Sequence, residues 1–327
     1  MALGSTQMVQ DPAGKVYDLD TFTSRRYNHP MLNSYGHAVP YPAHTLQAAG
    51  ARSAKVLRTD FTEARDEIVL DLRPTYTNDC ILELARSLAY VRGKGGQSAT
   101  ISDRVAFSRP ETYECPIITY GRVERRGDAA FTIVRPSNCG EKRLDFTVDT
   151  AGAKWHVKEE KIPNPERTEP TRWAVVLDEP TTKCSVTLRF APGDNPPDLS
   201  WTVGLESWNP EKELLMTNYF RSANQDLKVE KVGPDAWRFS CRRLITYQRS
   251  MAVDLVLDAE RKDGKTLVRG SVKNREGGTM FSFDGPYAIS SKDASGRAKS
   301  GFNQRFSVHC GETANLAPVE ISDCDGD

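Results

Sequence analysis

The amino-acid sequence predicts a nearly all-β protein, an antiparallel β-sandwich with a second, smaller β unit at its C-terminal end. Short runs rich in β-branched and aromatic residues recur from about residue 54 onward, and Gly, Pro, Asn and Asp separate them. The one helical period is weak and covers residues 209–221. Many short strands at such spacing favour an antiparallel sandwich over a parallel sheet with crossover helices. We therefore expect strand for at least about 40% of the chain and helix for under about 15%.

Individual strands are predicted where apolar and polar side chains alternate. The clearest runs in the first two thirds of the chain are 68–72, 130–134, 174–177 and 185–190. Turn-forming residues separate the runs and include Gly93-Lys94-Gly95-Gly96, Arg126-Gly127-Asp128 and the proline-rich segment 192–197. Both the lengths of the runs and the turn chemistry between them are typical of strands.

The proline-rich segment 192–197 is the predicted boundary between the two β units. Strand patterns resume after it at 227–230, 237–240, 252–257 and 267–272. The expected organisation is a first part at 1–50 with initial strands and a loop, a β-sandwich at 51–197, a small β unit at 198–320 and a disordered tail at 321–327.

Charge and hydropathy argue against two classes of partner. Lys+Arg and Asp+Glu both number 44, so no net field draws the chain to nucleic acid or to an anionic membrane. The longest apolar runs, 173–177 and 251–257, are far shorter than the roughly 20 residues that cross a bilayer. Residues 1–10 lack the features of a secretory signal. We expect a periplasmic or secreted location if a full-length parent carries a signal peptide.

The cysteines give little indication of a metal ribbon. Seven are dispersed along the chain without a Cys-x-x-Cys pair, namely Cys80, Cys115, Cys139, Cys184, Cys241, Cys310 and Cys324. A zinc ribbon needs closely paired thiolates, so buried apolar thiols are the better interpretation. One disulfide, between Cys310 and Cys324, stays an open alternative. The chain also lacks a phosphate-binding glycine loop, a nucleophile elbow and a His-Glu-x-x-His helix.

The densest polar and aromatic segment lies near the start of the chain. Three of the five histidines fall within it, namely His29, His37 and His44. The run at 33–40 reads Asn-Ser-Tyr-Gly-His-Ala-Val-Pro. Because Asn and Gly weaken strands and favour tight backbone, this run is predicted to be a structured loop that presents the imidazole of His37.

Three motifs occur together in this segment. They are Asp-x-x-Gly-x-Val-Tyr at 11–17, the pair Arg26-Tyr27, and Leu-Asn-Ser-Tyr-Gly-His-x-Val-Pro at 32–40. Weaker patterns follow at 59–62, 71–76, 86–90 and 101–107. Over roughly residues 3–192 this combination resembles the β-domain of the heparinase II/III-like polysaccharide lyases, and the resemblance implies a supersandwich-like fold.

The resemblance implies a function that this chain performs only in part. In that family an N-terminal α/α toroid and a β-sandwich form a cleft for an acidic polysaccharide, which is cleaved by β-elimination. Elimination beside a uronate needs a neutralised carboxylate, a base and an acid, and the resemblance implies that most of these groups sit on the toroid. We therefore expect a fragment or one piece of a split enzyme, inactive alone, whose partner is a toroid domain in cis or in trans.

The resemblance also implies a zinc site in the complete protein. Its elements are a His-x-His-x-Asp strand, an Asp one strand later and a His from the Gly-His loop. Asp11 and His37 match the last two elements, while the His-x-His strand would lie upstream of Met1. Two ligands are fewer than the three or four of a stable zinc site. Asp11 and His37 are predicted to approach each other near Tyr17; the alternatives are a structural loop histidine and a turn-initiating aspartate before Pro12.

Tyr35, Tyr17 and Arg26 are the candidate substrate-binding residues. Tyrosine faces stack on sugar rings and an arginine fork binds carboxylates or sulfates, while packing beneath the loop is the alternative for the tyrosines. Adjacent side chains rarely point into one site, so only one of Arg25 and Arg26 is expected there. Four further residues are assigned to the core or the rim, namely Trp155, His156, Trp201 and Trp208.

A second class of function stays open, a non-catalytic carbohydrate-binding or adhesion module built from two β domains. The two hypotheses differ in what a partner does. A toroid chain that restores β-elimination identifies the lyase, whereas glycan binding by the isolated chain, without need of a partner, identifies the binding module.

Overall fold

The computed structural model describes residues 1–3, 6–12, 14–50, 52–92, 96–137, 140–164, 167–193, 228–246, 249–275, 281–282, 291–292, 298–299, 307–308 and 311–322. The chain divides into two compact units. The first contains Met1–Pro136 and Glu141–Trp208, and the second contains Ser137–Gly140 and Asn209–Asp327. Strand makes up 60% and helical turn 5%, which confirms the all-β prediction. Within the described residues, no helix has the length and apolar character needed to cross a membrane.

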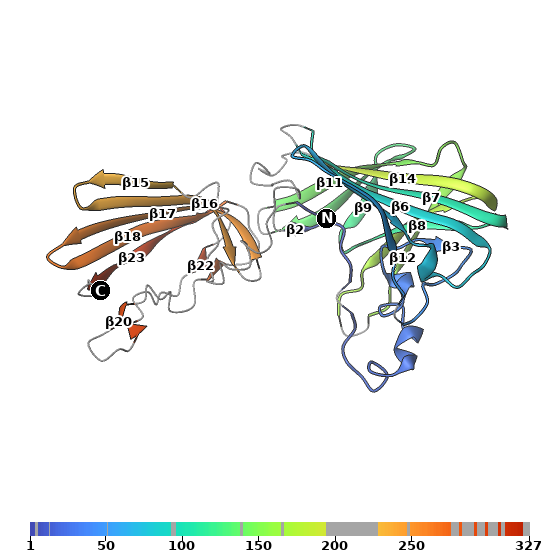
Figure 1. Ribbon diagram of the computed structural model, residues 1–327, viewed down its shortest axis with the longest axis horizontal. Coiled ribbons are helices and arrows are strands. Elements are labelled where there is room, and N and C mark those ends of the chain that lie inside the picture. Colours follow the sequence, from blue (N-terminus) through green and yellow to red (C-terminus); the bar gives the residue numbers. More distant parts are fainter. Residues whose placement is uncertain are drawn as a thin grey trace. The chain divides into compact units, whose positions relative to one another are not determined.

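The first unit is a sandwich of two antiparallel sheets (Figure 1). In spatial order, the eight-stranded sheet consists of β4 (Lys55–Phe61), β5 (Arg65–Asp71), β6 (Ile81–Val91), β7 (Ser98–Glu111), β14 (Thr181–Pro192), β11 (Gly140–Asp149), β10 (Ala130–Ser137) and β9 (Arg122–Arg125). The four-stranded sheet consists of β12 (Trp155–Lys161), β13 (Thr171–Leu177), β8 (Tyr113–Thr119) and β3 (Tyr41–Pro42). The four runs predicted in this unit fall on β5, β10, β13 and β14, as expected.

The core forms because alternate residues of each strand face the opposite sheet. In β11, Phe146 is buried, while Asp145 and Thr147 on either side of it are exposed. Trp173 of the four-stranded sheet meets Phe131 and Phe146 of the eight-stranded sheet edge to face, with ring centroids 4.8 and 5.0 Å apart. Such aromatic contacts add to the burial of apolar area, so this group fastens the two sheets together.

The start of the chain belongs to this core. After β1 (Ala2–Leu3) and β2 (Thr6–Gln7), Met8 is fully buried, and its carbonyl accepts a hydrogen bond of 2.6 Å from the Thr119 hydroxyl. The backbone then leaves the sheets and passes through two 3₁₀ turns, η1 (Ser24–Asn28) and η2 (Ser34–Gly36), before β3. The loop predicted at 33–40 is thereby confirmed, because its regular structure amounts to one 3₁₀ turn.

A buried ion pair joins two neighbouring strands inside the sandwich. Arg86 of β6 and Asp103 of β7 lie directly opposite each other and form two hydrogen bonds of 2.7 Å. Tyr113 donates a further hydrogen bond of 2.6 Å to Asp103, and the Cys115 thiol donates one of 3.3 Å. Burial by itself would lower the pKa of Arg86, but the charge and hydrogen bonds of Asp103 raise it above its ordinary value. Arg86 therefore keeps its charge within the core.

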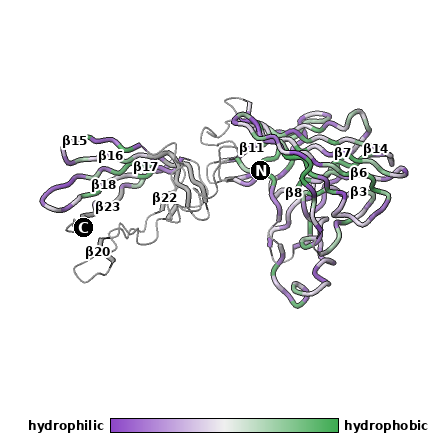
Figure 2. Tube along the Cα trace, viewed as in Figure 1, coloured by the Kyte–Doolittle hydropathy of each residue, from purple (hydrophilic) through white to green (hydrophobic). Residues whose placement is uncertain are grey.

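The second unit is built on a five-stranded antiparallel sheet. Its order is β15 (Lys228–Gly233), β16 (Ala236–Thr246), β17 (Arg249–Lys262), β18 (Lys265–Asn274) and β23 (Thr313–Ser322). Two short pairs accompany it, β19 (Phe281–Ser282) with β22 (Ser307–Val308), and β20 (Ser291–Lys292) with β21 (Ala298–Lys299). Asp263 and Gly264 both have positive φ, as a two-residue hairpin turn requires. Hydrophobic residues occur along the strands of this sheet and along those of the first unit (Figure 2).

Several sequence predictions concern residues at or beyond the limits of the described ranges. Ile321 and Ser322 pair with Thr266 and Lys265 as the end of β23, so the predicted tail starts too early by two residues. Among the described cysteines, Cys80 and Cys115 are buried free thiols and Cys184 is half-buried. The remaining predictions lie outside the described residues: the helical period at 209–221, Trp201, Trp208, the segment 194–197, Cys139, the pair Cys310 and Cys324, and the tail at 323–327.

Replacing Arg86 with Met tests how much the buried ion pair contributes to the stability of the fold. The substitution leaves the Asp103 carboxylate buried without its cation, so we expect the free energy of unfolding to fall by about 3–5 kcal/mol in urea denaturation. The matched control is Arg104→Met, which removes an exposed pair with Glu83 on the same strands and should cost less than about 1 kcal/mol. Equal losses in the two variants would contradict a special role for Arg86.

Candidate functional site

The Gly-His loop, residues 33–39, owes its shape to its own side chains and to one close backbone approach. The Asn33 side chain accepts a hydrogen bond of 2.9 Å from the backbone N–H of Tyr35 and thereby caps η2. The Gly36 N–H donates to the Pro30 carbonyl at 3.1 Å. A Cβ at Gly36 would lie 2.3 Å from that same carbonyl oxygen, so glycine is required there.

Two buried arginines hold the loop from the two sheets of the sandwich. Arg86 of β6 donates a hydrogen bond of 2.6 Å to the carbonyl of Ala38. Arg172 of β13, which is fully buried, donates one of 3.1 Å to the carbonyl of Tyr35 and pairs with Glu114 at 2.7 Å. Because charge-assisted hydrogen bonds are stronger than neutral ones, the two carbonyls on either side of His37 are firmly fixed.

Tyr35 anchors the loop on the four-stranded sheet. Its ring lies 4.3 Å from the Arg172 guanidinium carbon, and its hydroxyl donates to Glu160 and accepts from Lys158 at 2.9 Å. Burial raises the pKa of Tyr35, and the hydrogen bond to Glu160 raises it further. Since the hydroxyl and one ring face already have protein partners, the geometry favours packing over sugar contact for this residue.

The loop brings His37 onto Asp11. The His37 Nδ1 and Asp11 Oδ1 atoms are 2.6 Å apart, so the predicted approach of these two residues is confirmed. The pair lines a pocket of about 540 Å³ together with the polar side chains of Tyr27, Asn33, Ser34 and Gln47. A carboxylate on one ring nitrogen orients the imidazole and leaves Nε2 for another partner.

The other substrate-binding candidates contact residues of their own segment. Tyr17 is 76% exposed and contacts Phe22 edge to face at 5.3 Å. Arg25 pairs with Asp20 at 2.9 Å, whereas Arg26 lies over the Tyr27 ring at 5.5 Å and has no carboxylate partner within the described parts of the chain. Neither Tyr17 nor Arg26 lines the pocket.

Sequence reasoning missed the residues around the loop that carry no motif of their own. Gln47 lines the pocket but lies beyond the motif at 32–40, whereas Tyr27 belongs to the Arg26-Tyr27 motif. Arg172, Glu160 and Lys158 lie more than a hundred residues further along the chain, and no local pattern ties them to Tyr35.

Among the described residues, the other three histidines make contacts of their own. The His29 Nδ1 accepts a hydrogen bond of 3.1 Å from the Met31 N–H. The His44 ring meets Tyr41 edge to face at 5.7 Å. On the exposed surface of β12, His156 makes a second His–Asp pair, with Asp178 at 2.7 Å.

The Asp11–His37 pair does not by itself make a zinc site. Over the described ranges, no group of three or more His, Cys, Asp or Glu side chains is placed to hold a metal ion. Two ligands are fewer than a stable zinc site has, and a separation of 2.6 Å is that of a hydrogen bond. We therefore assign this pair no metal chemistry within this chain.

Comparison with known proteins gives a likeness of structure only. No protein-family model matches the chain, and no curated protein matches it. The solved structure "Heparinase III-BT4657 gene product" is 9% identical over 77% of this chain and 34% of its own, with a TM-score of 0.45. Its form with methylated lysines is 11% identical over 78% of this chain and 34% of its own, with a TM-score of 0.44. "Crystal Structure of Heparinase III" is 9% identical over 77% of this chain and 33% of its own, with a TM-score of 0.42. The chain thus spans about a third of their length, and TM-scores below 0.5 assign no function.

Gly36→Ala tests the close backbone approach that shapes the loop. The added methyl group must displace the turn from Pro30, so we expect a loss of about 1–3 kcal/mol in the free energy of unfolding and loss of the His37–Asp11 contact. Urea denaturation measures the first and the NMR signals of the His37 ring measure the second. Gly96→Ala is the control, since a Cβ there meets no atom within 4 Å. An unchanged His37 spectrum in the Gly36 variant would contradict the account.

His29 gives the site a pH dependence of known sign. Burial lowers the pKa of His29, and Lys15 lowers it further, against an opposing effect of Asp18. Between the lowered value and the ordinary one, the unfolded chain binds more protons. The stability from His29 is therefore full above the ordinary pKa and lost as pH falls through the folded-state value. NMR titration should show His29 protonating below free histidine, with the Met31 N–H signal moving in step. In His29→Asn this dependence should vanish; a normal His29 pKa would refute the prediction.

Proposed function

We propose that this chain is the β-sandwich portion of a heparinase II/III-like polysaccharide lyase, which cleaves a uronic-acid-containing polysaccharide by β-elimination. The observation that carries the proposal is the clamped Gly-His loop, which holds His37 against Asp11 at a pocket. The motifs around these two residues are those on which the resemblance to that family rests. The names of the solved structures that the chain resembles agree with this proposal but do not carry it.

The pocket supplies only some of the groups that elimination needs. An oriented imidazole can donate or accept a proton, and the Asn33 and Gln47 amides can hydrogen-bond sugar hydroxyls or a carboxylate. A base, an acid and a carboxylate clamp must act on one sugar together, and Asp11 is the one carboxylate in this pocket. We therefore assign the missing groups to a partner domain and expect the isolated chain to be inactive.

Exposed apolar side chains on the segment between Asp11 and the Gly-His loop support a partner domain. Tyr17, Leu19 and Phe22 are 76%, 93% and 77% exposed, and Tyr27 of the pocket is 41% exposed. Large apolar groups gathered on one segment are typical of an interaction surface. We propose that the α/α toroid contacts this segment, in cis or in trans, and closes the cleft over His37.

Zinc enters the proposal for the complete protein alone. There Asp11 and His37 would be two of the ligands, and the others would come from outside the described chain. An acidic polysaccharide as the substrate also fits a periplasmic or secreted location for the parent protein.

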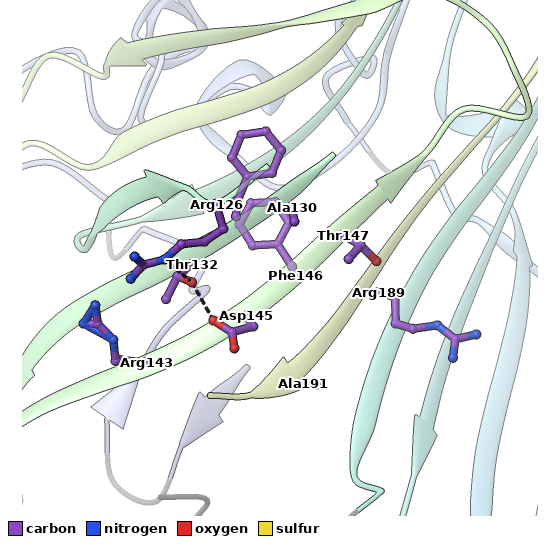
Figure 3. A pocket seen from close by; sticks show the side chains of 10 residues that line it. Arg126, Ala130, Thr132, Arg143, Asp145, Phe146, Thr147, Arg189 and Ala191 are labelled. Carbon is purple, nitrogen blue, oxygen red and sulfur yellow. Dashed lines mark hydrogen bonds between the residues drawn. The ribbon is translucent and has the colours of Figure 1, made fainter. Parts of the chain in front are cut away.

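A second candidate function is a non-catalytic carbohydrate-binding module. The observation that favours it is a second pocket, lined in part by arginines of the eight-stranded sheet (Figure 3), which contains no residue of the Gly-His loop. This function needs no partner domain, which separates it from the first.

The proposal predicts that activity requires both a toroid and His37. The isolated chain should give no unsaturated-uronate absorbance with heparin, heparan sulfate, alginate or chondroitin, and a toroid chain that includes the His-x-His strand should restore it. In the restored enzyme, His37→Ala should lower kcat by at least about tenfold, as loss of an oriented site histidine does. His156→Ala is the matched control, because it removes a similar His–Asp pair outside the pocket. Full activity of the His37 variant, or an equal loss in the control, would refute the role of His37.

A further inference from the structure

A second pocket, of about 610 Å³, lies on the first unit and shares no residue with the Gly-His pocket. Figure 3 shows its side chains on β10, β11 and β14 and on Arg126, which directly follows β9. The volume falls within the roughly 300–1,000 Å³ that is typical of ligand pockets.

Strand alternation explains the shape of this hollow. Phe131 and Phe146 line it from beneath and are 4% and 2% exposed, since their rings belong to the core. Between the inward residues of β11, Asp145 and Thr147 face outward and are exposed, and Thr132 beside them is 2% exposed. Their short side chains form a floor that lies lower than the long arginines around it. The Thr132 hydroxyl donates to Asp145 at 2.5 Å, as Figure 3 marks.

Arginines supply the walls and a surplus of positive charge. Arg126 and Arg143 lie on one side of the floor and Arg189 on the other (Figure 3). Glu124 pairs with both Arg126 and Arg143, at 3.1 Å for the latter. Arg189 is exposed and has no carboxylate partner in the part of the chain that the structure describes. Its guanidinium therefore retains its full capacity to bind an anion.

The chemistry of the lining selects an anionic sugar over a nucleic acid. A guanidinium fork fits a carboxylate or a sulfate, while Asp145 and Thr147 can exchange hydrogen bonds with sugar hydroxyls. A nucleic acid would need exposed rings for its bases, and both lining rings are buried.

We propose that this pocket is a second saccharide site, which binds an acidic sugar unit through Arg189 on one side and the exposed polar floor of Asp145 and Thr147 beneath it. For the identity of the polymer the inference rests on the proposed function, because both sites would hold one acidic polysaccharide. It goes beyond that function in giving the isolated chain an affinity for the polymer that needs neither His37 nor a toroid.

The test is calorimetric binding to the full chain with four probes: heparin oligosaccharides, alginate oligosaccharides, dextran and single-stranded DNA. We expect heparin or alginate to bind and dextran to fail; alginate binding shows that carboxylates suffice, and heparin alone shows that sulfate is required. Arg189→Gln should weaken binding by at least about tenfold, the value of a charge-assisted hydrogen bond, and Arg189→Glu should weaken it further. Arg109→Gln removes another exposed arginine of the same sheet, outside the pocket, and should leave binding unchanged.

These binding measurements test the second saccharide site independently of the lyase proposal. The inference is wrong if neither acidic glycan binds, or if DNA binds more tightly than the glycans. It is also wrong if Arg189→Gln leaves binding unchanged, or if Arg109→Gln weakens binding as much as Arg189→Gln does. His37→Ala should bind the glycans as the unsubstituted chain does, because it changes the other pocket. Failure of the lyase proposal appears instead as full activity of the restored enzyme after that same substitution.

Discussion

Arg86 and Asp103 carry opposite charges in the interior of the sandwich, and the shape of the nearby loop follows from the need to satisfy them. A buried ion pair is stable only when its remaining donors and acceptors also find partners. Tyr113 and Cys115 donate hydrogen bonds to Asp103, and the carbonyl of Ala38 accepts one from Arg86. Because Ala38 directly follows His37, the hydrogen bonding of a core charge sets the backbone of the residue that faces the pocket.

A second buried cation acts from the opposite sheet. Arg172 pairs with Glu114 within the four-stranded sheet and reaches the carbonyl of Tyr35. The loop is thus held on both sides of His37 by side chains from different sheets. The backbone that carries His37 is therefore fixed to the rigid sandwich. This arrangement suits a wall of a binding cleft, since a group can be positioned for a reaction only where its support does not move.

The sequence indicates some of these features and not others, for a physical reason. Alternating runs such as 130–134 and the Asn-Ser-Tyr-Gly-His loop have local signatures, so the strands and the loop were predictable. Asp11 and His37 were paired through the resemblance and not through any local rule. Arg86 and Arg172 lie in alternating strands, where a charged residue suggests an exposed face. Only the folded pairing of distant strands shows that Arg86 points inward and that Arg172 is buried beneath Tyr35, on the face of β13 opposite to Trp173. The same pairing brings Arg143 and Arg189 to one pocket.

The claim that the Gly-His loop is part of the rigid sandwich can be measured by native-state hydrogen exchange. The amides of Gly36 and His37 donate to Pro30 and Ser34, within a loop that two buried arginines hold. We expect these amides to exchange with an opening free energy close to that of the amides of Arg86 and Asp103 in the central strands. Exchange of Gly36 and His37 at the rate of an open surface loop, while β6 and β7 stay protected, would contradict the account.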